Sequence, residues 1–344
     1  MPEITATPSR PDAKLPVAVV GCGRMGRLHA RVYSQMPNVH LVGVYDADKD
    51  KAAATAEEYG TRSFHNLRDL LPHVAAATIA VPTQHHAELA EPFLHRGVAC
   101  LIEKPLARDE FECRRIIEAS HKYKPIVQVG HIERFNPAVR AMKRLSIRPQ
   151  FMEVTRISPL TFRSIDVGVV LDMMIHDIDI VLMLAGSEVT DVQAVGVSVI
   201  GDVEDIANAR LTFANGCVAN LTASRLAMKT ERKLRIFSQD AYVSLDYGKR
   251  YGIVAHRGGN VEAIRDAVKK IRAGEVEDLT QLNFTDLINI EELKIEEAEP
   301  IRAELDEFVD AVMNNKPSPV PAEDGMRAVA IAARIVEVIG GKTV

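Results

Sequence analysis

The first 130 residues alternate between short apolar runs and longer amphipathic segments. Five runs have the length and composition of buried strands: LPVAVVG, VHLVGVYD, AATIAVP, VACLIEKP and PIVQVGH. Between them, apolar positions recur at helical spacing over Met25–Gln35, Lys49–Tyr59, Gln84–Arg96 and Asp109–Lys122. Apolar strands separated by amphipathic helices predict a parallel sheet covered on both faces, and therefore an α/β fold.

The pattern changes after about residue 130. FMEVTRIS predicts a strand, and VVLDMMIHDIDIVLMLAG predicts a buried helix that ends at Gly186. Alternating runs follow in VTDVQAVGVSVI, ANARLTFANGCVANLTASR, KLRIFSQDAYVSLDY and YGIVAHRG, with a hairpin signal at Asn215–Gly216. This part is predicted to be α+β, with a large, mostly antiparallel sheet that leaves one face open.

The end of the chain is predicted to be helical. EELKIEEAEPIRAELDEFVDAVMN is acidic, which is typical of a solvated helix face or loop. PAEDGMRAVAIAARIVEVIG predicts a final amphipathic helix. The start, MPEITATPSRPDAK, has no apolar segment of the kind found in signal peptides and predicts a disordered tail.

Composition and charge exclude several classes of protein. The 344 residues carry a formal net charge of −5 and contain no Trp, which argues against a nucleic-acid-binding protein. No apolar run approaches the roughly 20 residues of a membrane span. The four cysteines are scattered and form no CxxC pair, so we expect reduced thiols in a cytoplasmic protein and no metal site.

A glycine-rich turn between the first strand and the first helix predicts a dinucleotide site. In GCGRMG, Gly21 permits a tight turn, Gly23 lets the backbone approach a pyrophosphate, and Gly26 lets helix and strand pack closely. The spacing alone is weak, but Asp46 ends the second strand 20 residues after Gly26, where a carboxylate binds a ribose 2′-hydroxyl. We therefore expect NAD to bind at Gly21, Cys22, Gly23, Arg24, Met25, Gly26 and Asp46.

Other polar residues lie where later strands end, which is where ligands of such sheets bind. Thr83 and His86 could contact the cofactor, although Thr83 could equally cap a helix and His86 could lie at the surface. Glu103 and Lys104 end the next strand, and Pro105 restricts the backbone of Lys104 and allows a cis bond. Alone, Lys104 would be interpreted as a surface lysine at a strand end.

The buried helix LDMMIHDIDIVLML carries Asp172 and His176 on one face, and Asp179 extends that face by a turn. Buried polar groups need hydrogen-bond partners or a water-filled cleft. The pair is therefore either a satisfied core pair or part of a cleft wall.

GCGRMG, EKPL and a helix with Asp and His four residues apart together resemble the glucose–fructose oxidoreductase/inositol dehydrogenase/MocA family, from about Lys14 onward. The resemblance implies that Lys104 reaches substrate and nicotinamide, and that Asp172 and His176 join it in the active site. An imidazole suits the base that removes a hydroxyl proton, and an ammonium group stabilises a developing alkoxide. His176 is thus expected to be the base, Lys104 the polarising group and Asp172 the orienting group, although His176 and Lys104 could exchange roles.

The expected domains are a tail over residues 1–13, an NAD-binding Rossmann domain over residues 14–131 and an α+β domain over residues 132–344. The second domain is expected to bind substrate and to form oligomers. Its last helix, over residues 321–340, could pack back on the Rossmann domain.

GHIERFNP and LDMMIHDIDI most resemble the nucleotide-sugar branch of this family. The resemblance implies oxidation of a sugar hydroxyl, specifically the 3-hydroxyl of UDP-N-acetylglucosamine, in a pathway shared with an aminotransferase. Substrate contacts are expected at His131, Arg134 and Asn136, although this segment could instead cap a helix. Arg156 and Arg163 are candidates for the two phosphates, and surface ion pairs are an equal alternative.

Two further functions stay open from the sequence. The substrate could be a free sugar or a cyclitol, or the protein could be a dinucleotide-sensing regulator without activity. Many members of the family have a glycine-rich turn where this chain reads SQDA, so no sugar contact is carried over near Ser238. The open face of the second sheet predicts a homodimer or homotetramer.

Overall fold

The structure is a computed structural model that describes residues 14–145, 147–161, 166–257, 269–274 and 288–341. The predicted tail over residues 1–13 and the candidate Arg163 lie outside the described residues. The chain divides into two compact units. The first contains the described residues up to Phe135 together with Glu299–Ala330, and the second contains Asn136–Ala298 with the chain from Ile331 onward.

The first unit is built on a six-stranded sheet with the order β3-β2-β1-β4-β5-β6, in which every pair is parallel. Its strands are β1 (Leu15–Val20), β2 (Val39–Tyr45), β3 (Arg62–Phe64), β4 (Ala76–Ile79), β5 (Ala99–Glu103) and β6 (Val127–Gly130). Its α-helices are α1 (Arg24–Ser34), α2 (Lys49–Glu58), α3 (Leu67–Leu70), α4 (His86–Leu94), α5 (Glu110–Tyr123) and α9 (Pro300–Asn314). The first unit also contains three short 3₁₀ turns, η1 (Leu71–His73), η2 (Thr83–His85) and η3 (Ile132–Phe135), and the start of α10 (Ala322–Gly340), up to Ala330.

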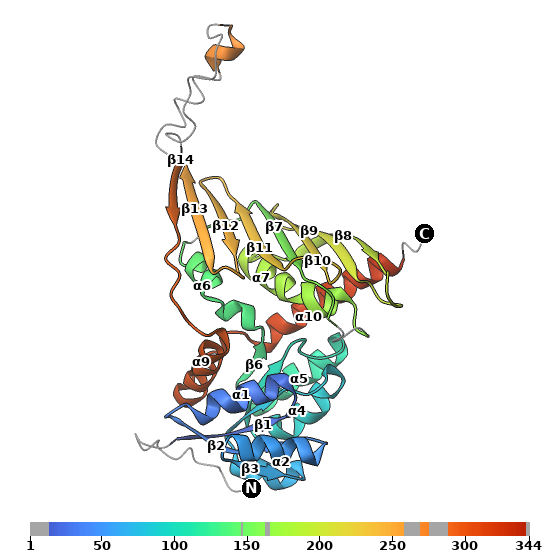
Figure 1. The fold of residues 1–344 in the computed structure, drawn as a ribbon, viewed down its shortest axis with the longest axis vertical. Coiled ribbons are helices and arrows are strands. Elements are labelled where there is room, and N and C mark those ends of the chain that lie inside the picture. Colours follow the sequence, from blue (N-terminus) through green and yellow to red (C-terminus); the bar gives the residue numbers. More distant parts are fainter. Residues whose placement is uncertain (1–13, 146, 162–165, 258–268, 275–287, 342–344) are drawn as a thin grey trace. The chain divides into compact units, whose positions relative to one another are not determined.

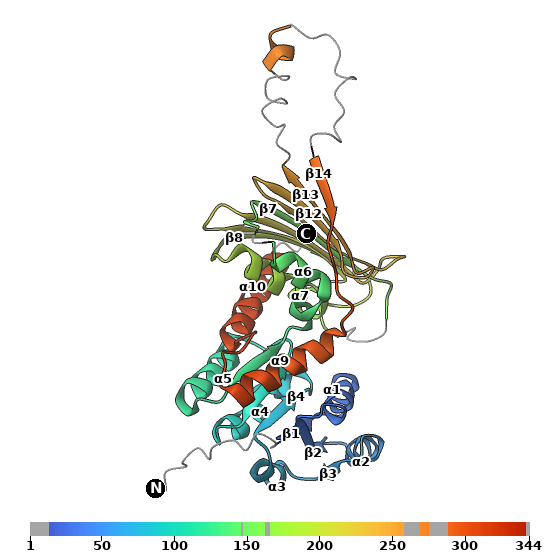
Figure 2. The same cartoon turned by 90° about the vertical axis from the view of Figure 1, so that its left-hand side faces the viewer.

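Helices cover both faces of this sheet. α1 and α9 pack on each other and share a core with β1 and β2, while α4 and α5 pack together over β4 and β5 (Figures 1 and 2). The doubly covered parallel sheet predicted from the sequence is confirmed. The third strand and α3 were absent from the predicted elements because Arg62–Phe64 is too short to give a periodic signal.

The second unit contains an eight-stranded sheet with the order β14-β13-β12-β11-β7-β10-β9-β8. The strands are β7 (Phe151–Ile157), β8 (Val189–Val197), β9 (Ile206–Phe213), β10 (Val218–Ser224), β11 (Glu231–Phe237), β12 (Ala241–Asp246), β13 (Tyr251–Arg257) and β14 (Ile288–Glu292). Of these pairs only β7–β10 is parallel, which confirms the predicted mostly antiparallel sheet. The helices are α6 (Pro137–Lys143), the π-helical turn η4 (Val170–Met174) and α7 (Ile175–Ala185).

Two glycines in the second unit have the backbone geometry expected from the sequence. Gly186 ends α7 with a φ of 56°, and Gly216 turns the β9–β10 hairpin with a φ of 84°. One predicted helix is shorter than expected. The acidic segment beginning at Glu291 becomes helical only at Pro300, where a fixed φ and a missing N–H suit the first helical position.

The two faces of the antiparallel sheet differ. One face of the sheet is covered by α6, by α7 and by the part of α10 (Ala322–Gly340) that begins at Ile331 (Figures 1 and 2). A Cβ atom at Gly196 of β8 would touch Ile339 of α10. The described residues place no helix on the other face. Strand β7 alternates half-buried and buried positions accordingly.

Aromatic rings line up across the face that carries no helix. Phe151, Phe237 and Tyr242 come from three adjacent strands, with ring centroids 5.7 and 5.0 Å apart. Phe237 remains 38% exposed. Among the described residues, no helix has the length and apolar character needed to cross a membrane.

Candidate functional site

The glycine turn after β1 has the shape that a dinucleotide requires. Gly21 has a φ of 98°, and a Cβ atom there would lie 2.3 Å from the Ala80 carbonyl oxygen. A Cβ atom at Gly26 would lie 1.7 Å from the Gly21 carbonyl oxygen. A Cβ atom at Gly23 would instead meet no atom within 4 Å, so this position faces open space. Gly21 and Gly26 therefore leave no room for a Cβ atom, and Gly23 lies next to the open space that the predicted pyrophosphate would need.

A cavity of about 840 Å³ lies over this turn, at the carboxyl ends of the strands. Gly23 precedes α1 without a side-chain cap, and the first turn of α1 contains no acidic residue, so its first N–H groups can bind an anion. The cavity therefore fits a dinucleotide and its pyrophosphate. Its lining comprises Gly21, Gly23, Arg24, Met25, Tyr45, Asp46, Ala47, Asp48, Lys51, Ala80, Val81, Pro82, His85, Glu88, Leu89, Glu103 and Lys104.

Asp46 lines the cavity and also holds the turn in place. Its Oδ2 accepts the Cys22 N–H at 2.6 Å, and its Oδ1 accepts the Asp48 N–H at 2.8 Å. Each carboxylate oxygen can accept a second hydrogen bond, so Asp46 can still bind a ribose hydroxyl. Burial raises the pKa of the neighbouring Cys22 thiol to about 11, so this thiol is a buried structural group. Cys22 contacts Asp46 through its backbone N–H.

The predicted residues at the strand ends have different surroundings. Glu103 and Lys104 line the cavity, and the Lys104–Pro105 bond is cis. His86 is buried, with Nδ1 2.9 Å from the Pro105 carbonyl oxygen and Nε2 2.9 Å from the Val81 carbonyl oxygen. Its burial lowers its pKa. Thr83 begins η2 and is half-buried, whereas the adjacent His85 is exposed and lines the cavity.

In the second unit, Asp172 lies in the π-helical turn and His176 in the first turn of α7, and both are half-buried. Glu204 fixes the start of this turn, because its Oε1 accepts the Val170 N–H at 3.1 Å. A Cβ atom at Gly168 would lie 2.1 Å from the same oxygen, so a larger residue there would displace the Glu204 carboxylate. π-helical turns are frequent at functional sites, because the extra residue changes the direction of the side chains.

Arg156 forms a buried ion pair with α7. Its Nε and Nη2 donate to the two carboxylate oxygens of Asp177 at 2.7 and 2.8 Å, and both side chains are at most 5% exposed. This bidentate pair joins β7 to α7 next to His176. From the sequence, Arg156 was expected either to bind phosphate or to form a surface ion pair. The structure shows neither role, because the Arg156 guanidinium is buried against α7.

The segment predicted to contact substrate contains several local interactions. Arg134 donates to Asp324 at 2.6 Å. Burial works to raise the pKa of Asp324, but the charges and hydrogen bonds of Arg134 and Arg327 together outweigh it, so the pKa is lowered. The Asn136 side chain accepts the Ala138 N–H at 3.0 Å and caps α6, with Pro137 at the first helical position. His131 is buried.

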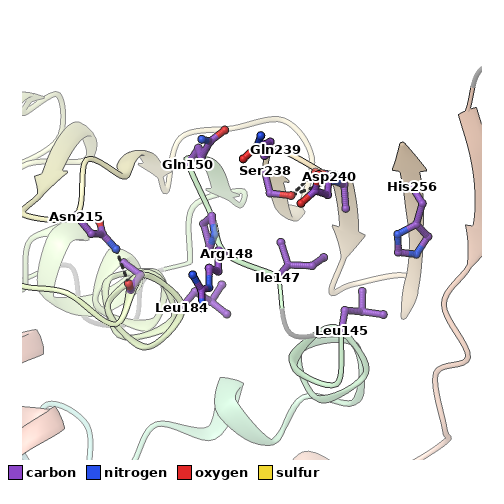
Figure 3. Close-up of a pocket in the computed structure, with 13 residues that line it drawn as sticks. Leu145, Ile147, Arg148, Gln150, Leu184, Asn215, Ser238, Gln239, Asp240 and His256 are labelled. Carbon is purple, nitrogen blue, oxygen red and sulfur yellow. Dashed lines mark hydrogen bonds between the residues drawn. The ribbon is translucent and has the colours of Figure 1, made fainter. Parts of the chain in front are cut away.

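A second cavity, of about 890 Å³, lies in the second unit near the β11–β12 turn (Figure 3). Ser238 closes this turn, since its hydroxyl donates to the Ala241 carbonyl oxygen at 2.9 Å and accepts the Ala241 N–H at 3.0 Å. The turn that reads SQDA in this chain is thus closed by a serine side chain. The lining comprises Leu145, Ile147, Arg148, Pro149, Gln150, Leu184, Ala185, Asn215, Ser238, Gln239, Asp240, Ala241 and His256, and includes no predicted site residue.

A parallel six-stranded sheet with a glycine cradle at its carboxyl edge defines a dinucleotide-binding Rossmann domain. Residues 15–131 match the family described as "Oxidoreductase family, NAD-binding Rossmann fold", and residues 154–244 match the "GFO/IDH/MocA C-terminal domain". The chain belongs to the Gfo/Idh/MocA family of NAD-binding oxidoreductases. The predicted family, fold, cofactor and enzyme class are confirmed.

Relatives of known activity extend this assignment. The UDP-N-acetylglucosamine 3-dehydrogenase of Acidithiobacillus ferrooxidans is 34% identical over 318 residues, which cover 92% of this chain and 95% of that enzyme. A solved structure of the same enzyme has a TM-score of 0.85, covering 95% of this chain and 98% of that one, at 32% identity. Inositol 2-dehydrogenase of Corynebacterium glutamicum is 34% identical over 191 residues, which are 52% of this chain and 56% of that enzyme.

Proposed function

We propose that this protein is an NAD-dependent dehydrogenase that oxidises the 3-hydroxyl of UDP-N-acetylglucosamine to a ketone. The observation that carries the proposal is the similarity to UDP-N-acetylglucosamine 3-dehydrogenase, which extends through 92% of this chain and 95% of that enzyme. The similarity therefore covers both the cofactor domain and the domain with the antiparallel sheet. NAD bound at the glycine cradle would accept the hydride from the sugar carbon.

Oxidation of a secondary alcohol also releases the hydroxyl proton, and we assign three side chains to this step. An imidazole titrates near neutral pH and suits a general base, so His176 takes the proton. The Lys104 ammonium group stabilises the developing alkoxide, and Asp172 orients the substrate or Lys104. In a second assignment, Lys104 takes the proton and His176 orients the hydroxyl.

The Lys104→Met variant tests this assignment. We expect kcat to fall roughly 100- to 10,000-fold, because the alkoxide loses its stabilising cation. Binding of NADH, followed by its fluorescence, should change only a few-fold, since the glycine cradle is intact. The matched control is Lys143→Met, which removes an exposed lysine of α6. Activity of Lys104→Met within about threefold of the parent would refute the assigned role.

The substrate is tested by incubating the protein and NAD with UDP-N-acetylglucosamine, free N-acetylglucosamine, glucose and myo-inositol. We expect NADH formation with the nucleotide sugar, and mass spectrometry should detect the corresponding keto product. The free amino sugar separates recognition of the sugar from recognition of the diphosphate. Turnover restricted to unphosphorylated polyols would contradict the proposal.

A cyclitol or a free sugar is the second candidate substrate. The similarity to inositol 2-dehydrogenase over 52% of this chain favours it. The ion pair of Arg156 with Asp177 favours it as well, because it occupies one of the two arginines expected to bind phosphate. The substrate panel distinguishes the two candidates directly.

We further propose that the chain forms a homodimer or homotetramer through the open face of its second sheet. The aromatic row of Phe151, Phe237 and Tyr242 on this face supports the proposal, because exposed apolar patches commonly mark interfaces. Light scattering should give a multimer, and Phe237→Glu should weaken it. A monomer at working concentration would contradict it. An aminotransferase that consumes the 3-keto product is the expected partner in the pathway.

A further inference from the structure

A buried chain of hydrogen bonds leads to the strand end that carries Lys104. The Tyr33 hydroxyl of α1 lies 3.0 Å from Thr78 Oγ1 of β4, and Thr78 Oγ1 lies 3.3 Å from His29 Nδ1. His29 Nε2 lies 3.1 Å from Glu103 Oε1, the last residue of β5. All four side chains are buried. The mechanism proposed above uses none of these side chains.

The chemistry of the groups gives this chain a direction. An ionised carboxylate can only accept, so His29 Nε2 carries a proton and donates it to Glu103. In the neutral imidazole, Nδ1 is then an acceptor, and it receives the Thr78 hydroxyl proton. Thr78 in turn accepts from Tyr33. Each donor therefore points toward Glu103. The chain of hydrogen bonds ends at the Glu103 carboxylate, which carries a negative charge next to Lys104.

Glu103 also contacts the backbone of Lys104, to which a catalytic role is assigned above. Its Oε2 accepts the Lys104 N–H at 3.2 Å. A Cβ atom at Gly130 would lie 3.0 Å from the same oxygen, so glycine leaves room for the carboxylate to turn toward Lys104. On the following residue, the Pro105 carbonyl oxygen lies 2.9 Å from His86 Nδ1. The segment Glu103–Lys104–Pro105 is therefore held between two buried histidines.

Four titratable groups act on the Glu103 carboxyl: His29 from α1, His86 from α4, Glu304 from α9, and Lys104 at the end of its own strand. Burial works to raise its pKa. The hydrogen bond from His29 is the largest of the interactions that oppose burial, and together they place the pKa below its usual value. Burial and the charge of Glu103 raise the pKa of Glu304 well above its usual 4.5, which favours its protonated form.

We propose that His29 is a positioning residue for the dehydrogenase, which acts through Glu103 to keep Lys104 charged and in place. This inference rests on the catalytic role proposed for Lys104. The imidazole holds the Glu103 carboxylate ionised and oriented, and the carboxylate then favours the ammonium form of Lys104 and holds its backbone N–H. Without His29, Glu103 would take up a proton more readily, and the negative charge that Glu103 contributes next to Lys104 would be weakened.

The test measures the protonation of Lys104 directly, without substrate or cofactor. Competitive acetylation with acetic anhydride modifies only unprotonated amines, and mass spectrometry reports the rate at Lys104 relative to the exposed Lys143. His29→Leu should move the pH midpoint of Lys104 acetylation down by about one unit, which is about tenfold faster labelling at a fixed pH below the midpoint. His29→Gln, which retains an amide donor toward Glu103, should restore most of the difference.

A second variant and a matched control keep the test decisive. Glu103→Gln removes the charge with little change of shape and should shift Lys104 in the same direction, so it carries the test if His29→Leu does not fold. Thr61→Val is the control, because it removes a hydrogen bond of the same unit, from Thr61 Oγ1 to the Leu41 carbonyl oxygen at 2.7 Å. Thr61→Val should leave the Lys104 midpoint unchanged. An unchanged midpoint in folded His29→Leu or Glu103→Gln overturns the inference.

Activity measurements separate this inference from the proposed function. In an active enzyme, His29→Leu should lower kcat more than it raises KM. The alkaline limb of the pH–rate profile should move to lower pH, as the midpoint of Lys104 acetylation does. If the midpoint shifts while the parent protein oxidises no sugar, the effect of His29 on Lys104 stands and the proposed function fails. If the parent oxidises the nucleotide sugar and the midpoint does not shift, the proposed function stands and the inference fails.

Discussion

The two units bury their polar side chains in different ways. The second unit pairs opposite charges: Arg156 binds Asp177 of α7 through two hydrogen bonds, and Arg225 Nε lies 3.1 Å from Asp205 Oδ1. Around the end of β5, the first unit instead connects hydroxyls, an imidazole and a carboxyl in one chain, and it buries a second carboxyl, Glu304, nearby.

This difference determines how each unit responds to pH. Arginine stays charged throughout the accessible range, so the pairs around α7 are fixed and give a rigid support for the helix that carries His176. The groups around Glu103 can exchange protons, since the pKa of one carboxyl is lowered and that of the other is raised. The first unit should therefore be sensitive to pH, whereas the support of α7 should be sensitive to deletion of either charge.

Deleting one partner of the α7 ion pair should have the largest effect on stability. Arg156→Leu leaves the Asp177 carboxylate buried without its arginine, and we expect a loss of about 3–5 kcal/mol in the free energy of unfolding. Denaturant unfolding followed by circular dichroism measures it.

The double variant Arg156→Leu/Asp177→Leu sharpens this prediction. Because neither charge remains, the double variant should be more stable than Arg156→Leu alone. The comparison would fail if the single variant lost less than about 1 kcal/mol, since the pair would then behave like an exposed ion pair.

The buried Glu304 should have the next largest effect, and the effect should depend on pH. Neither carboxyl oxygen makes a hydrogen bond to the residues that the structure describes, and the pKa is raised well above 4.5. Above about pH 4.5 the unfolded chain releases this proton while the folded chain keeps it, so stability falls as the pH rises toward the folded pKa. Glu304→Gln removes this loss and should be more stable than the parent by a margin that grows by about 1.4 kcal/mol per pH unit.

Unfolding experiments at several pH values between about 5.5 and 7.5 test this prediction, with the interval chosen above the ordinary carboxyl pKa. The exposed Glu118 of α5 gives a matched control, and Glu118→Gln should show a margin that does not change with pH. A constant margin for Glu304→Gln would mean that Glu304 is ionised in the folded protein, and the contrast between the two units would disappear.

The sequence predicted those parts of the molecule that depend on local periodicity. Apolar runs placed the five longer strands of the parallel sheet, and Gly186 and Asn215–Gly216 marked a helix end and a hairpin that the structure confirms. It did not predict β3, which has only three residues, or the non-helical start of the acidic segment before Pro300. These depend on tertiary pairing and on a single proline, and periodicity detects neither.

The candidate site was predictable where a motif requires a backbone shape. Gly21 and Gly26 could be identified because the packing of the turn leaves no room for a Cβ atom, and Gly23 because a pyrophosphate would need the open space beside it. The chain of hydrogen bonds from Tyr33 to Glu103 was missed, since its bonded pairs are 45 to 74 residues apart in sequence. They meet only through the packing of α1 on β4 and β5. A weak signal existed, because His29 and Tyr33 are four residues apart on the buried face of α1. The partner of Arg156 could likewise not be predicted from its position in β7.

The smallest predicted effect lies at the far end of the same chain. Tyr33→Phe removes the hydroxyl that donates to Thr78 and should cost about 1 kcal/mol of stability, the ordinary value of one buried hydrogen bond. Burial raises the pKa of Tyr33, so this hydroxyl keeps its proton throughout the working range and the cost should be the same from about pH 6 to about pH 9.

In Tyr33→Phe, Thr78 can still donate to His29, so the midpoint of Lys104 acetylation should move less than in His29→Leu. Unfolding and acetylation measured on the same variant would reveal a graded chain, in which the effect on Lys104 decreases with each hydrogen bond away from Glu103. An effect of Tyr33→Phe as large as that of His29→Leu would show instead that the network responds as one unit, as a general loss of packing would.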